Sequence, residues 1–157
     1  MHKNNTTKQY IIKESNIMKK NNKGFSLVEL IIVIAIMAIL AGALAPALIK
    51  YINKSRKSAD ESNADVIRTS IQTALSNEEA VDSFCASNTS GIATSKTVSD
   101  LKGMGAFGDE LKKILGNNQV KAKYYTTKGQ EFKVDINYND NKVIVYSPDG
   151  NTVIVGN

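Results

Sequence analysis

One uninterrupted apolar run constrains the fold more than any other feature of the sequence. The 20 residues from Leu30 to Ile49 include no charged side chain. As an α-helix rising 1.5 Å per residue, this run is about 30 Å long, which matches the hydrocarbon thickness of a bilayer. It therefore predicts a membrane-spanning helix near the N-terminus. The 108 residues after Ile49 are enough for one domain with its own core.

The basic surplus of the chain lies before this run. The sequence holds 20 Lys and Arg against 15 Asp and Glu, a net charge of +5, and residues 1–24 contain six of the basic and one of the acidic residues. The remainder carries 14 of each sign, so the basic composition indicates membrane topology rather than a nucleic acid partner. The cations before the run, Lys19, Lys20 and Lys23, favour a cytoplasmic N-terminus. The opposite flank is also basic: Lys50, Lys54, Arg56 and Lys57.

The residue types that usually carry catalysis or bind metals are sparse. A single cysteine, Cys85, excludes an internal disulfide framework and a Cys-based zinc site, and His2 is the only histidine. Asp135, Asp140 and Asp149 lie in separate predicted turns without calcium-ligand spacing. The sequence therefore predicts no enzyme, no cofactor and no metal site.

A single carboxylate, Glu29, directly precedes the apolar run. A charge at the centre of a membrane helix costs about 2.5–3.5 kcal/mol on insertion scales, and less near the interface. Two interpretations stay open. Glu29 either lies at the headgroup level in contact with water, or it is kept for a positively charged partner such as a newly formed N-terminal amine.

The segment KGFSLVEL and the apolar helix after it resemble the class III leader of type IV prepilins and pseudopilins. The resemblance implies that a membrane prepilin peptidase cleaves after Gly24 and that the new amine of Phe25 is methylated. Pro46 also falls where these pilins usually carry a proline. With one cysteine, the chain is similar to the disulfide-free pilins of Gram-positive bacteria. A start at Met18 instead of Met1 would give a compact basic leader, and both starts stay open.

Two pairs of residues gain a predicted role in assembly from this resemblance. Phe25 and Glu29 are four residues apart, on one helical face, so the pair closes within one subunit or between neighbours. The resemblance favours the neighbour, with Glu29 setting the axial register. Pro46 deprives the carbonyl of Gly42 of its helical N–H partner. Gly42 and Pro46 then mark either a tolerated kink or a helix break that unwinds in the fibre.

The hydrophobic pattern predicts an α+β pilin fold. After a leader at 1–24, one long helix covers a membrane and fibre-core half, 25–49, and an amphipathic half, 50–77. A variable region, 78–119, holds short helices after Thr97 and at 108–115, and 120–157 forms an antiparallel sheet of about four strands. The expected strands are 120–125, 132–138, 142–147 and 152–155. The expected apolar side of the amphipathic half includes Leu48, Ile52, Ser55, Ala59, Asn63, Val66, Ser70, Ile71, Ala74 and Leu75, and its solvated side Lys57, Asp60, Glu61, Asp65, Arg68 and Gln72.

The resemblance implies a structural role, as a main subunit of a type IV pilus. Before assembly the chain would span the cytoplasmic membrane once with its head outside, and after assembly it would form a surface fibre of identical copies. The implied partners are the prepilin peptidase, an assembly platform and a cytoplasmic ATPase, with no nucleic acid. Adhesion, aggregation and twitching motility are the implied activities.

Two alternatives remain at this point. Within the family, the chain would be a pseudopilin of a type II secretion or competence DNA-uptake system. Outside it, the apolar run would be a conventional signal peptide of a secreted enzyme or binding module, cleaved at Ala41-Gly42-Ala43 or Ala43-Leu44-Ala45. Glu29 and the helical pattern that continues beyond Pro46 weigh against the signal peptide.

Overall fold

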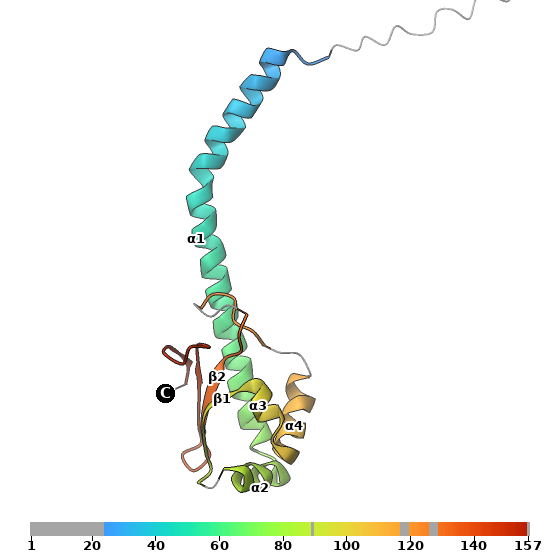
Figure 1. The fold of residues 1–157 in the computed structure, drawn as a ribbon, viewed down its shortest axis with the longest axis vertical. Helices are drawn as coiled ribbons and strands as arrows, with labels where there is room; N and C mark the ends of the chain where they lie inside the picture. Colours follow the sequence, from blue (N-terminus) through green and yellow to red (C-terminus); the bar gives the residue numbers. More distant parts are fainter. Residues whose placement is uncertain (1–23, 89, 117–119, 126–128, 157) are drawn as a thin grey trace, which may run out of the picture. The chain divides into compact units, whose positions relative to one another are not determined.

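The computed structural model describes residues 24–88, 90–116, 120–125 and 129–156 (Figure 1). Its order along the chain is α1 (Leu27–Ala74), α2 (Glu78–Ser87), β1 (Ile92–Thr97), α3 (Val98–Lys102), α4 (Gly105–Leu115), β2 (Lys133–Asn137), β3 (Lys142–Tyr146) and β4 (Val153–Val155). A long N-terminal helix and a four-stranded antiparallel sheet confirm the predicted α+β class. The predicted leader, apart from Gly24, lies outside the described residues.

The chain divides into two compact units, Met1–Leu44 and Ala45–Asn157. In the first unit α1 runs from Leu27 with every side chain exposed, including each residue of the apolar run up to Leu44. By length and composition α1 can cross a membrane, and none of its most apolar stretch is buried within the protein. A core helix of a soluble protein would bury that surface, so this apolar surface must be covered by something other than its own chain.

The second unit, the head, is built on the C-terminal part of α1. Ala64, Ile67, Ile71 and Ala74, spaced at three and four residues, are fully buried in one cluster that also contains side chains from the other helices and the sheet. The rings of Phe84 and Phe107 pack there with centroids 5.1 Å apart: a contact between α2 and α4.

The apolar side predicted for this part of α1 is partly wrong. Val66 is 52% exposed, whereas its neighbour Ile67 is completely buried. Ile67 and Ile71 are four residues apart, so both large side chains reach the core only if that row faces inward. The helix also ends at Ala74 rather than Asn77, because the Asn77 side chain accepts a hydrogen bond from the N–H of Ala80 at 3.2 Å and caps α2.

The sheet has the strand order β1-β2-β3-β4, with all neighbours antiparallel. β2 and β3 alternate between buried and partly buried residues, and Val134, Ile136, Val143 and Val145 contribute to the core. The predicted turns are found between these strands. Asn141, at φ 49°, follows β2, and the Gly150 N–H donates to the Ser147 carbonyl at 2.8 Å after β3.

The strand predicted at 120–125 is wrong, and the sheet instead includes β1, from the region expected to be a loop. Only Lys121 forms a ladder pair there, an isolated bridge to Glu131. The alternation of apolar and polar residues at 120–125 suggested a strand, but the N–H groups of Lys123 and Tyr124 donate to the side chain of Asp60 rather than to a neighbouring strand. β1 could not be predicted from its sequence, IATSKT, because it lacks a regular alternation of buried and exposed residues. Only Ala93 is buried, and the strand contains a bulge, with Ser95 at φ 53°.

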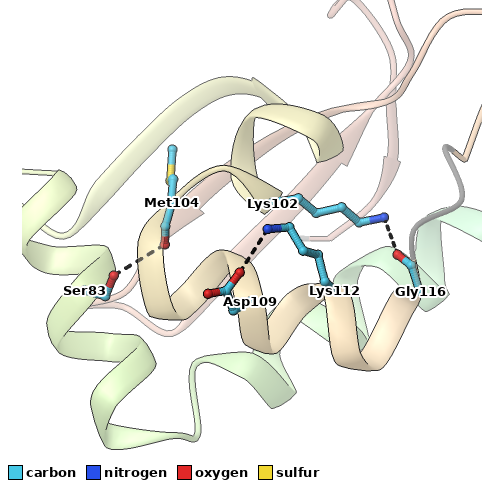
Figure 2. A network of polar contacts seen from close by, with 6 residues as sticks. All are labelled: Ser83, Lys102, Met104, Asp109, Lys112 and Gly116. Carbon is cyan, nitrogen blue, oxygen red and sulfur yellow. Dashed lines mark hydrogen bonds and ion pairs between the residues drawn. The ribbon is translucent and has the colours of Figure 1, made fainter.

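The short helices predicted after Thr97 and up to Leu115 are confirmed, although α4 begins at Gly105 rather than Gly108. Gly108 allows α4 to pass close to α3, since an added Cβ would lie 2.4 Å from the Lys102 carbonyl oxygen. Figure 2 shows the Lys102 ammonium donating to the Gly116 carbonyl at 2.7 Å, beyond the C-terminus of α4. A cation there interacts favourably with the negative end of the helix dipole.

The side chain that binds segment 120–125 is Asp60, which the sequence places on the solvated side of the helix. In the structure Asp60 is completely buried. Its carboxylate accepts the Lys123 N–H at 3.0 and 2.9 Å and the Tyr124 N–H at 2.8 Å. Asp60 thus ties α1 to a segment 63 residues further along the chain. A buried carboxylate is tolerated only with such donors.

We predict that Asp60→Ala lowers the free energy of unfolding of the head by about 2–3 kcal/mol. The substitution removes hydrogen bonds to a charged group and leaves the N–H groups of Lys123 and Tyr124 without an acceptor. Urea unfolding of the full chain in detergent micelles measures this change. The matched control is Asp65→Ala, at an exposed position of the same helix, which should change stability by less than about 0.5 kcal/mol. Equal stabilities of the two variants would contradict the role of Asp60.

The capping box of α3 predicts a small pH dependence. The Thr97 N–H donates to the Asp100 carboxylate at 2.9 Å, and the Asp100 N–H donates to the Thr97 hydroxyl at 3.1 Å. Hydrogen bonding of the carboxylate to the Thr97 backbone, and second to the Thr97 side chain, lowers the pKa of Asp100. A lowered pKa in the folded state adds stability that is present above the unfolded pKa of about 3.9 and is lost as the pH falls through the folded pKa. Since Asp100 is exposed, the contribution is below about 1 kcal/mol.

Unfolding measured from neutral to acidic pH tests this expectation. The original chain should lose more stability on acidification than Asp100→Asn, because the amide cannot titrate. Stability curves that stay parallel down to the lowest pH would contradict it.

Candidate functional site

The candidate site is the start of α1, where the predicted cleavage and assembly residues lie. Gly24, Phe25 and Ser26 precede the helix, which begins at Leu27, and Phe25 is 91% exposed. The Ser26 hydroxyl accepts the N–H of Val28 at 3.3 Å. In return, the Glu29 carboxylate accepts the N–H of Ser26 at 2.8 Å.

This arrangement is similar to a capping box, with Ser26 at the cap and Glu29 three residues later, although the Ser26 hydroxyl accepts the N–H of Val28 rather than that of Glu29. Each side chain accepts a backbone N–H that has no partner within the helix. A negative charge in the first helical turn also interacts favourably with the helix dipole. The sequence signal for this contact is the spacing Ser-x-x-Glu directly before an apolar run, at Ser26 and Glu29.

The geometry alters the expected relation between Phe25 and Glu29. The prediction that Phe25 and Glu29 share one helical face requires a helix that includes Phe25. In the structure Phe25 lies before the first helical residue, Leu27. The nitrogen that contacts Glu29 in the uncleaved chain is that of Ser26, the second residue after the predicted cleavage point. The contact uses Oε2, and no hydrogen bond to Oε1 is found among the residues that the structure describes.

Gly42 and Pro46 lie further along the same helix. α1 is helical through both positions, and Pro46 is inside it. Among the described residues, no atom lies within 4 Å of a Cβ added to Gly42 or to Gly24, so packing against this part of the chain does not require either glycine. The structure therefore brings together Gly24, Phe25, Ser26 and Glu29 as local neighbours, with Gly42 and Pro46 as separate positions on α1.

The aspartates considered as calcium ligands contribute to turns and the sheet. Asp135 accepts the Ser95 N–H at 2.7 Å, Asp140 accepts the side-chain amide of Asn137 at 2.6 Å, and Asp149 accepts the Asn151 N–H at 3.1 Å. Within 24–88, 90–116, 120–125 and 129–156, no three His, Cys, Asp or Glu side chains gather as metal ligands. Cys85 is a free thiol, partly buried against the core.

Comparison with known proteins gives matches that include this site. Residues 19–45 match the family model of the prokaryotic N-terminal methylation motif. The type IV major fimbrial protein FimA of Dichelobacter nodosus is 41% identical over 76 residues, which cover 48% of this chain and 49% of that protein. A second FimA of the same organism is 43% identical over 68 residues, covering 43% and 44% respectively. No solved structure matches the chain significantly.

These findings define the class of protein. The cationic segment before Gly24, the capped start of α1 and the uncovered apolar helix are the features of a chain with a prokaryotic N-terminal methylation motif. Over this part, the chain is similar to type IV major fimbrial proteins. It spans about half the length of the fimbrial proteins that it matches.

Proposed function

We propose that this chain is the structural subunit of a type IV pilus, and not an enzyme. The observation that carries the proposal is the α1 surface of the first unit, which is apolar and exposed along its whole length. Lipid covers such a helix before assembly, and the same helix of other copies covers it in a fibre. Catalytic groups are not needed for this role, and the energy for assembly would come from a cytoplasmic ATPase acting through an assembly platform.

The first proposed step is cleavage between Gly24 and Phe25 by a prepilin peptidase, followed by methylation of the Phe25 amine. Phe25 is exposed and both residues lie outside the helix, so the backbone is accessible to a peptidase cleft. The space around Gly24 is open, and glycine lets an enzyme approach the backbone closely. The hydrogen bonds of Ser26 and Glu29 fix the start of the helix after the scissile bond, which therefore lies outside the helix.

The second proposed step is the pairing of Glu29 with the amine of Phe25 on a neighbouring subunit. Glu29 uses Oε2 on its own Ser26 N–H, which leaves Oε1 to accept a bond from the incoming amine. In the apolar core of a fibre, a missing partner would leave a buried charge uncompensated, at a cost of about 3–5 kcal/mol. Only the axial position that joins the two groups avoids this cost, so the pair sets the register.

The third proposed step concerns Gly42 and Pro46. Pro46 has no N–H, so the Gly42 carbonyl has no partner from that residue even where α1 is helical. Glycine adds backbone freedom at the same point. Helix packing in the fibre would unwind this stretch, whereas in the single chain it stays helical.

We place the chain in the cytoplasmic membrane before assembly, crossing it once with the head outside, and on the cell surface afterwards. The proposed partners are further copies of itself, the peptidase and the assembly machinery. The fibre would serve adhesion, aggregation or twitching motility. The balance of 14 basic and 14 acidic residues after residue 24 supports self-association, because a chain without net charge does not repel its copies at long range.

The N-terminal sequence and mass of the chain isolated from its cells test the processing step. We expect a chain that begins at Phe25 with a methylated amine. A start near Leu44 or Pro46 would instead identify a signal peptide and a secreted protein, and would remove the proposal. A long surface fibre composed mainly of this chain distinguishes the main pilin from a pseudopilin.

The register role predicts a separate phenotype for Glu29→Ala. The variant should still be cleaved, because the carboxylate is not part of the scissile bond, but it should give at least about tenfold less sheared fibre than the original chain, from the loss of the charge pair. The control is Asp65→Ala, an exposed acid on α1 within the head, which should give the original amount. Normal fibre yield from Glu29→Ala would exclude the register role.

A further inference from the structure

The flank of the apolar run on the side of the head carries more positive charge than topology explains. Lys50, Lys54, Arg56 and Lys57 are all exposed, and no acidic residue occurs between Glu29 and Asp60. An excess of cations is expected on the cytoplasmic side of a membrane helix. The proposed topology places these cations on the other side, where they require a different explanation.

Acids within the chain account for few of these charges. Asp60 is buried, and its carboxylate accepts N–H groups of the backbone. Lys57 lies 3.8 Å from Glu61, with both side chains about half exposed. For Lys50 and Lys54, no ion pair or hydrogen bond is found within the part of the chain that the structure describes.

Lys50 and Lys54 form one surface together with Tyr51. The three side chains line a shallow hollow of about 240 Å³ in the head unit. Positions 50 and 54 are one helical turn apart, about 6 Å along the axis, and therefore lie on the same face. Tyr51 is 75% exposed. The hollow is thus open to the surroundings, and its lining combines one aromatic ring with two ammonium groups.

This combination fits the headgroup layer of a membrane. The surface directly follows the run that ends at Ile49, so a helix spanning the hydrocarbon at 30–49 brings it to the level of the phosphates. Tyrosine favours this level, because its ring is apolar and its hydroxyl is polar. Lysine stems lie along apolar material while their ammonium groups reach the phosphate oxygens.

We propose that Lys50, Tyr51 and Lys54 bind the phosphate groups of anionic phospholipids in the leaflet on the side of the head. This contact fixes the depth of α1 in the membrane and is released when the subunit is extracted into the fibre. The inference rests on the proposed membrane stage of a pilin. It assigns these residues to lipid, and contact with acidic groups of a second copy is the alternative that the test excludes.

The full chain with Tyr51→Trp provides the probe. The sequence contains no tryptophan, so this variant has a single indole, and tryptophan is also suited to the headgroup level. The variant is placed in nanodiscs of phosphatidylcholine and phosphatidylglycerol in which one of the two lipids is brominated. Quenching of the indole by each brominated lipid reports which lipid occupies the site beside residue 51.

We expect brominated phosphatidylglycerol to quench more strongly than its share of the bilayer predicts. Each cation near an anionic surface contributes about fivefold to the preference, so Lys50→Gln with Lys54→Gln should lower it by at least about fivefold. The charge-matched control is Lys112→Gln with Lys113→Gln. These lysines lie on α4 and pair with Asp109 and Glu110 at 2.9 and 2.8 Å, and their removal should leave the preference unchanged.

Equal quenching by the two lipids would overturn the inference. A preference that survives in Lys50→Gln with Lys54→Gln, or that is lost in the α4 control, would overturn it too. Failure of the lipid site and failure of the pilin proposal give different results. A lipid preference without fibre or methylated Phe25 would refute the pilin function alone, whereas normal fibre without lipid preference would refute the lipid site alone.

Discussion

The structure depends on one constraint: the apolar first part of α1 has no cover within its own chain. From Leu27 to Leu44 every side chain is exposed, at a cost in water that no other part of the molecule offsets. Only hydrocarbon or a set of equally apolar helices satisfies such a surface. The head, in contrast, buries its own core, from Ile67 of α1 to Val145 of the sheet. One chain thus combines a self-sufficient domain with a segment that must always have a partner.

The start of α1 gives that segment a defined polar end. The Glu29 carboxylate accepts the N–H of Ser26, and the Ser26 hydroxyl accepts the N–H of Val28, so two backbone groups at the start of the helix have partners. The same hydrogen bond leaves one carboxylate oxygen for a partner. At the other end of the run, Lys50, Tyr51 and Lys54 provide a second polar boundary. The apolar run is therefore bounded by a carboxylate on one side and by two ammonium groups on the other.

Sequence patterns predicted the features that depend on signals between residues close together in the sequence. The apolar run, the α+β class, the turn at Asn141 and the short helices up to Leu115 could all be predicted, because periodicity, turn residues and caps are local. The position of the first strand could not be predicted from the sequence. Ile92–Thr97 is small and polar with a bulge, whereas the more regular segment 120–125 is held by Asp60. That carboxylate appeared solvated in the helical pattern because its donors lie far away in the sequence. In the candidate site, the order of Gly24, Phe25 and Glu29 before the apolar run was enough to single them out in the sequence. The hydrogen bond between Glu29 and the Ser26 N–H was found in the structure.

The bond between Asp60 and Lys123 has a consequence for the order of folding. Its two ends are 63 residues apart, so the loop that it closes contains most of the head. Until that second end is available, the Asp60 carboxylate lacks the backbone N–H groups that accompany its burial in the head. The part of α1 around Asp60 therefore reaches its final packing only after the chain up to Tyr124 has returned to it, which makes this contact a late step in the folding of the head.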